Sequence, residues 1–217
     1  MEDIMTDEVV TSGGYDISQI YLFLGRCFSY PTKELFDKMR GVGAPGELGA
    51  LVDGLPFEIE FKGIPSPPLP RDEFESEYIN TFDIGFGPTI PCSLYETAYS
   101  RGDMNTRDVY EDLFRFYEHF DVRLSDREKD YPDHLVVELE FMAFLAKKES
   151  EAIENGKDPQ PYRLAQIDFL ERHLKKWVFL LCERLNERIK EPFYQKTGEL
   201  LRNFVDSHYL FLKTKMK

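Results

Sequence analysis

The sequence predicts an all-α protein that folds as a single helical domain. Apolar residues recur along most of the chain at three- and four-residue spacing, which is the period of an amphipathic helix. Only the run Phe57–Phe61 alternates with the period of two that a half-buried strand requires. A length of 217 residues is enough for one substantial core, so we assign residues 1–217 to one domain.

The first predicted helix stops near Tyr30, because Pro31 disfavours helical backbone in the residue before it. Its apolar face consists of Ile17, Ile20, Tyr21, Leu24 and Phe28. A short second helix is expected from Thr32. The stretch from about 41 to 70 is rich in glycine and proline, above all in Pro65–Pro70, and is predicted to be an irregular exposed loop.

A helical face resumes after this loop and is broken over Asp83–Pro88 by two glycines and a proline. Its apolar positions are Phe74, Tyr78 and Phe82. The next helix is expected from Arg107, with Asp108, Glu111 and Asp112 near its positive N-terminal end. Its apolar residues are Val109, Leu113, Phe116, Tyr117 and Phe120.

The segment Asp133–Lys148 is apolar on nearly every side, which is typical of a central, enclosed helix. A long helix is predicted to follow, with its apolar face running from Leu164 to Leu181 and its end before Glu191–Pro192. The last helix carries Leu200, Leu201, Phe204, Val205, Tyr209 and Leu212.

Composition excludes several classes of function. The formal net charge of -13 would repel nucleic acid, whereas it suits a basic partner as well as solubility. Three scattered cysteines without a C-x-x-C pair fit a reducing cytoplasm. The first twenty residues carry acids where a signal peptide carries basic residues. Glu138 and Glu140 interrupt the apolar run that ends at Phe144, so no membrane span is expected.

Catalytic motifs are missing from the sequence: it holds no phosphate-binding loop, no dinucleotide-binding glycine motif and no G-x-S-x-G. His134 and Glu138 share a helix face, yet nothing completes a metal shell around them. We therefore predict no enzyme, no metal and no cofactor. Two alternatives stay open, namely a small helical enzyme that uses His134 with Cys92 or Glu138, and a structural subunit of a redox complex.

Two segments place polar groups beside very apolar sequence. The first is Tyr131–His134, which leads directly into the enclosed helix; its acid either caps that helix, or Asp133 and His134 line a groove in which a carboxylate grips a guanidinium. The second is the Gly- and Pro-containing loop Gly87–Glu96, followed by Tyr99. It is either a simple connector with a core tyrosine or a binding loop that delivers Tyr95 and Glu96.

At these residues the chain resembles the TorD/DmsD/NarJ family of redox-enzyme maturation chaperones. The matching segments cover about half of the chain in the family's order, and the block Tyr131–Leu135 with the following Glu138–Met142 is the specific part. The others are Phe74–Tyr78 leading to Phe82, Gly87–Pro88 with Pro91–Glu96 and Tyr99, and Phe169–Leu170 with His173–Leu174 and Trp177.

The resemblance implies a TorD-like helical bundle that acts as a cytoplasmic, system-specific chaperone in anaerobic respiration. Its partner would be the N-terminal leader or tail, or the apo form, of a molybdopterin-containing oxidoreductase catalytic subunit. The chaperone would hold this subunit for cofactor insertion and for assembly or export. Whether the leader carries twin arginines, and whether the chaperone is a monomer or a homodimer, is left open.

The resemblance also places the peptide-binding site at Asp133, His134 and Tyr95, with Phe82 beside them. Glu138, Glu96 and Tyr131 complete the candidate set. Where family members often carry an acid directly before the proline, this chain has Tyr131, which offers stacking instead of charge. We expect apolar leader side chains to bury against Tyr95 and Phe82, while Asp133 or Glu138 pairs with an arginine.

Overall fold

The computed structural model describes residues 5–41, 45–68, 70–83, 90–100, 105–124 and 131–216. Within these residues the regular elements are all helical, which confirms the predicted all-α class. They are α1 (Met5–Phe28), α2 (Lys33–Gly41), α3 (Pro45–Asp53), α4 (Arg71–Tyr78), the π-helical turn η1 (Ile79–Asp83), the 3₁₀ turn η2 (Glu96–Ala98), α5 (Thr106–His119), α6 (Leu135–Glu154), α7 (Gln160–Arg172), α8 (Leu174–Arg188) and α9 (Pro192–Thr214).

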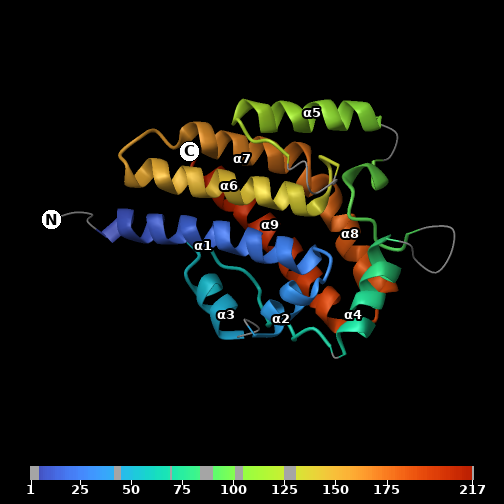
Figure 1. Cartoon of the computed structure of the whole chain (residues 1–217). Coiled ribbons are helices and arrows are strands. Elements are labelled where there is room, and N and C mark those ends of the chain that lie inside the picture. The colour runs from blue at the N-terminus through green and yellow to red at the C-terminus, as the bar shows by residue number, and fades with distance from the viewer. Residues whose placement is uncertain are drawn as a thin grey trace.

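The long helices form a bundle in which α1 lies along α6, α6 packs on α7, and α8 pairs with both α7 and α9 (Figure 1). Helix α5 covers one side of this bundle, while α2, α3 and α4 lie on the opposite side of α1 (Figure 1). None of the helices in the described residues combines the length and apolarity needed to cross a membrane.

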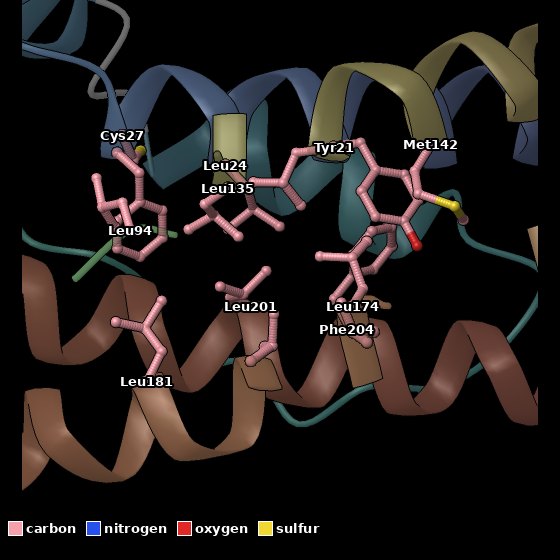
Figure 2. Packing of buried hydrophobic residues seen from close by; sticks show 14 of the residues in the cluster. Tyr21, Leu24, Cys27, Leu94, Leu135, Met142, Leu174, Leu181, Leu201 and Phe204 are labelled. Atoms are coloured by element: carbon pink, nitrogen blue, oxygen red, sulfur yellow. The ribbon is translucent and has the colours of Figure 1, made fainter. Parts of the chain in front are cut away.

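The core lies between the α1–α6 layer and the α8–α9 pair (Figure 2). Tyr21 and Leu24 of α1 point toward Leu201 and Phe204 of α9, and all four side chains are buried. Every residue of the predicted first stripe is buried as well. Gly198 lets α8 and α9 approach closely, since a Cβ at this position would lie 3.0 Å from Leu185 Cδ1.

Two expectations for the region from 41 to 70 need correction. Helix α3 forms inside the stretch predicted to be irregular, because Leu48, Leu51 and Val52 recur at helical spacing and pack into the core against α1. The candidate strand Phe57–Phe61 does not form, since Phe57 lies in a bend and residues 58–61 have no regular secondary structure. The side chain of Asn203 on α9 donates to the Glu60 carbonyl oxygen at 3.0 Å, so a helix binds this segment.

The helix predicted to run through Leu164–Leu181 is two helices, α7 and α8, which meet at His173. The backbone of His173 is not helical (φ -124°, ψ -95°), although the sequence has no glycine or proline there. The central helix α6 begins at Leu135 instead of Asp133 and continues beyond Lys148 to Glu154. Of the predicted break over Asp83–Pro88, all but Asp83 lies outside the described residues.

Candidate functional site

The loop that carries Tyr95 and the block that carries His134 meet in the structure. The amide of Leu135 donates to the carbonyl oxygen of Leu94 at 2.8 Å, and the amide of Glu96 donates to the carbonyl oxygen of Asp133 at 3.0 Å. These two bonds make an isolated antiparallel bridge between Tyr95 and His134. Two of the segments that carry the family resemblance thus form one unit at the start of α6.

The Asp133 carboxylate holds this unit together from inside. Its side chain is fully buried, and its Oδ2 accepts the backbone amide of Thr97 at 3.1 Å and the Thr97 hydroxyl at 2.7 Å. A buried carboxylate needs such donors because it has lost its hydration. Asp133 therefore fixes the position of the Tyr95 loop, and its carboxylate does not reach the surface in this conformation.

His134 supplies the N-cap of α6. Its Nδ1 accepts a hydrogen bond from the Val136 amide at 3.3 Å, so Nδ1 carries no proton in this geometry. The expected capping of this helix end is thus present, with the imidazole in place of the Asp133 carboxylate. The ring is buried, and its centroid lies 4.9 Å from the ring of Tyr95 in an edge-on arrangement.

Three tyrosines form the outer layer of the site, and we call them the tyrosine surface. The Tyr131 ring lies 6.1 Å from that of Tyr95 and 5.8 Å from that of Tyr110, on which it stacks. Tyr131 is 58% exposed, whereas Tyr95 and Tyr110 are half-buried. Desolvation, followed by the nearby Asp133 charge, raises the pKa of Tyr110 to about 12. The Tyr110 hydroxyl therefore keeps its proton at physiological pH.

Beneath the tyrosine surface lies a set of buried acids. Glu138 is fully buried and accepts a hydrogen bond from Trp177 Nε1 at 3.2 Å. Desolvation raises its pKa well above the ordinary value, and the charges of Glu96 and Asp133 raise it further. Glu138 is therefore enclosed in this conformation and ties α6 to α8, where Trp177 is the single tryptophan of the chain.

A second polar connection crosses the domain through His173. Its Nδ1 lies 2.9 Å from Glu96 Oε2, and its Nε2 lies 3.2 Å from Asp112 Oδ2. Asp112 on α5 also pairs with Arg172. Because Glu96 follows Tyr95 directly, this connection links the Tyr95 loop to α5 and to the junction of α7 and α8.

Sequence reasoning missed the roles of Thr97, Asp112 and His173. Asp112 and His173 do have a signal, since each lies among the apolar positions of a predicted helix, and a polar residue at such a position needs a buried partner. Asp112 was expected instead to complement the helix dipole. Thr97 has no such signal, because the sequence gives no indication that it meets Asp133.

The structure brings six of the seven predicted peptide-binding residues into one region: Asp133, His134, Tyr95, Glu96, Glu138 and Tyr131. Phe82 instead lies in the core, where its ring is 2% exposed and contacts Phe28, Tyr78 and Tyr194. Among the six, only Tyr95 and Tyr131 have substantially accessible side chains.

The residues of the enzyme alternative are all buried. Cys92 is fully buried, and desolvation raises the pKa of its thiol to about 11, so almost no thiolate forms near neutral pH. Glu138 is equally enclosed. Across the described residues, no three histidine, cysteine, aspartate or glutamate side chains converge as metal ligands would.

The fold and the site together define an all-helical domain with an aromatic surface above buried acids. Residues 64–183, more than half of the chain, match the family model described as nitrate reductase delta subunit. The chain belongs to this family, that of the TorD/DmsD/NarJ redox-enzyme maturation chaperones.

Individual relatives agree with this family. The chain is 34% identical to the selenate reductase assembly chaperone protein of Thauera selenatis and 36% identical to the chlorate reductase assembly chaperone protein of Ideonella dechloratans. Each match covers 87% of this chain and 85% of the relative. These relatives are assembly chaperones, which confirms the prediction that the chain is not an enzyme.

The fold also has a solved counterpart. A putative redox enzyme maturation protein from Archaeoglobus fulgidus superposes with a TM-score of 0.53, over 88% of this chain and 93% of that one. Sequence identity between the two is 18%, so this likeness concerns the fold alone. It confirms the expected TorD-like helical bundle.

Proposed function

We propose that this protein is a cytoplasmic chaperone for the catalytic subunit of a molybdopterin-containing oxidoreductase. It binds the N-terminal leader of that subunit and holds the apo form for cofactor insertion and assembly. The relatives named above, which assemble selenate and chlorate reductases, support the class of client. The chain itself needs no bound cofactor for this role.

One observation carries the proposal for the site: the bridge between Tyr95 and His134 holds two aromatic side chains at the surface above buried acids. A half-exposed, firmly supported tyrosine offers a large contact area at little entropic cost, which is typical of binding hot spots. The buried carboxylates act through the loop that they hold, so the leader contacts Tyr95, Tyr131 and Tyr110 directly.

Electrostatics favour a basic leader. An arginine over the exposed face of Tyr131 gains cation–π attraction, and the net charge of -13 attracts a positive segment toward the chaperone. Long-range attraction of this kind is screened by salt. Affinity for the leader is therefore expected to fall as ionic strength rises.

The first test is a pull-down from anaerobically grown cells of the source organism, with bound proteins identified by mass spectrometry. The leader of the recovered subunit is then synthesised as a peptide and titrated against the protein. Tyr131→Ala is expected to weaken peptide binding by about 1–2 kcal/mol, or roughly 5- to 30-fold, through loss of the aromatic contact. Tyr15→Ala is the matched control, because Tyr15 is 56% exposed on α1 and Tyr131 is 58% exposed.

The two parts of the proposal fail separately. If the wild-type protein recovers no molybdopterin-containing subunit, the chaperone function is wrong. If the subunit is recovered but its leader binds Tyr131→Ala and Tyr15→Ala equally well, the tyrosine surface is not the site.

A further inference from the structure

A groove of about 680 Å³ runs between α5 and α7, apart from the tyrosine surface. The two helices are antiparallel here, since Phe116 meets Phe169 at 5.2 Å and Phe120 meets Tyr162 at 5.8 Å. One end of the groove is apolar and the other end is acidic. Its walls include Phe116, Phe120, Pro161 and Leu164 at the apolar end, and Asp112 and Asp168 at the acidic end.

The apolar end leaves large side chains open to solvent. Leu164 is 50% exposed, and Phe116 and Phe120 are half-buried. From Pro161 to Arg172 the groove follows α7 over three helical turns, or roughly 16 Å at 1.5 Å per residue. This length fits a partner helix of about three turns that carries apolar residues on one face.

The acidic end already holds an arginine, which belongs to the protein itself. Arg172 pairs with Asp112, its Nη1 lies 3.4 Å from Asp168 Oδ2, and its guanidinium lies 5.1 Å from the centre of the Phe116 ring. Two carboxylates and an aromatic face are the groups that bind a guanidinium well. Side-chain exposures of 44% for Arg172 and 57% for Asp168 make this place accessible from outside.

The other basic side chains of the groove do not compete for this place. Arg115 also lines the groove, and its guanidinium lies 4.0 Å from the Glu111 carboxylate. His119 lies one helical turn further along α5, toward the apolar end. Arg172 is therefore the basic residue that contacts Asp112, Asp168 and the Phe116 ring, and its side chain is 44% exposed.

We propose that the α5–α7 groove docks an amphipathic, arginine-bearing helical segment of the client, and that Arg172 occupies the place of the client's arginine until the segment binds. This inference rests on the proposed chaperone function for the identity of the partner. Asp112 connects the groove to the binding loop through His173 and Glu96, so the two surfaces share one polar network.

The proposal makes opposite predictions for the two charges at the acidic end. Arg172→Gln frees the acids and is expected to tighten binding of an arginine-bearing segment by about two- to fivefold, whereas Asp168→Asn weakens it by a similar factor. Lys176→Gln and Glu171→Gln are the matched controls, because they make the same charge changes near this end of α7 at residues that do not line the groove. Leu164→Ala tests the apolar end.

The probe is a designed helical peptide of about sixteen residues with leucines on one face and a single arginine, measured by fluorescence anisotropy against a copy that carries neutral citrulline in place of arginine. The expected result is tighter binding to Arg172→Gln than to wild type for the arginine peptide alone. Equal binding of the two peptides, no binding to either protein, or the same response from the control variants would overturn the proposal. If a client subunit is recovered and binds the groove variants as tightly as wild type, the groove proposal is wrong, while the proposed chaperone function still stands.

Discussion

Replacement of Glu138 by glutamine is expected to change how stability depends on pH. Glu138 is fully buried, and desolvation together with Glu96 and Asp133 raises its pKa well above the ordinary value of 4.5. The folded protein therefore keeps this carboxyl protonated at pH values at which the unfolded chain has released the proton. Glutamine is neutral at every pH, has nearly the same shape and keeps an acceptor for Trp177.

The sign follows from proton binding. A raised pKa contributes stability that is fully present below pH 4.5 and is lost as the pH rises toward the folded pKa. Across this window the free energy of unfolding falls by about 1.4 kcal/mol per pH unit because of this one group. Glu138→Gln removes this slope, so the stability of the variant relative to wild type rises with pH.

The assay is urea denaturation of wild type and Glu138→Gln at about pH 5, 6 and 7. Unfolding of both proteins is monitored by the same far-ultraviolet circular dichroism signal. Titrating groups that do not interact with Glu138 are the same in both proteins and cancel in the difference. We expect the difference in the free energy of unfolding to grow by about 1.4 kcal/mol between pH 5 and pH 6. A constant difference across the series would refute the argument, because it would mean that Glu138 is ionised in the folded protein.

Two further predictions concern buried polar groups. Thr97→Val removes the hydroxyl that donates a hydrogen bond to Asp133 Oδ2 at 2.7 Å. This loss should lower the free energy of unfolding by about 1.5–3 kcal/mol, measured by thermal melts. Thr214→Val, at an exposed threonine, is the control. Losses of equal size would argue against the buried bond. Desolvation lowers the pKa of His208 to about 3. Nδ1 of its neutral ring shares a hydrogen bond with the Tyr21 hydroxyl, at a distance of 2.9 Å. Its contribution to stability is thus present above pH 6.5 and is lost as the pH falls toward 3. Its proton resonances should stay constant between about pH 7.5 and 5.5, and a midpoint near 6.5 would contradict this.

Much of the fold could be predicted because helical periodicity is a local property. The stripe from Ile17 to Phe28 needed no knowledge of its partner to indicate a helix and its buried face. The same reasoning failed where a distant contact decides the local backbone. Phe57–Phe61 alternates as a strand does, yet α9 is its neighbour. The helix is interrupted at His173, where the ring meets two carboxylates from other elements.

The candidate site divides in a similar way. The sequence by itself indicated two segments of the candidate site, since the blocks around Tyr95 and Asp133–His134 carry the family resemblance, and they do meet in the fold. Only the tertiary structure decided which of their side chains face outward. Asp133 and Glu138 are charged or polar by sequence, and the packing of α6 against its neighbours encloses both, while Tyr131 remains exposed. The physical reason is that exposure depends on the elements that cover a residue, and those elements lie far away in the chain.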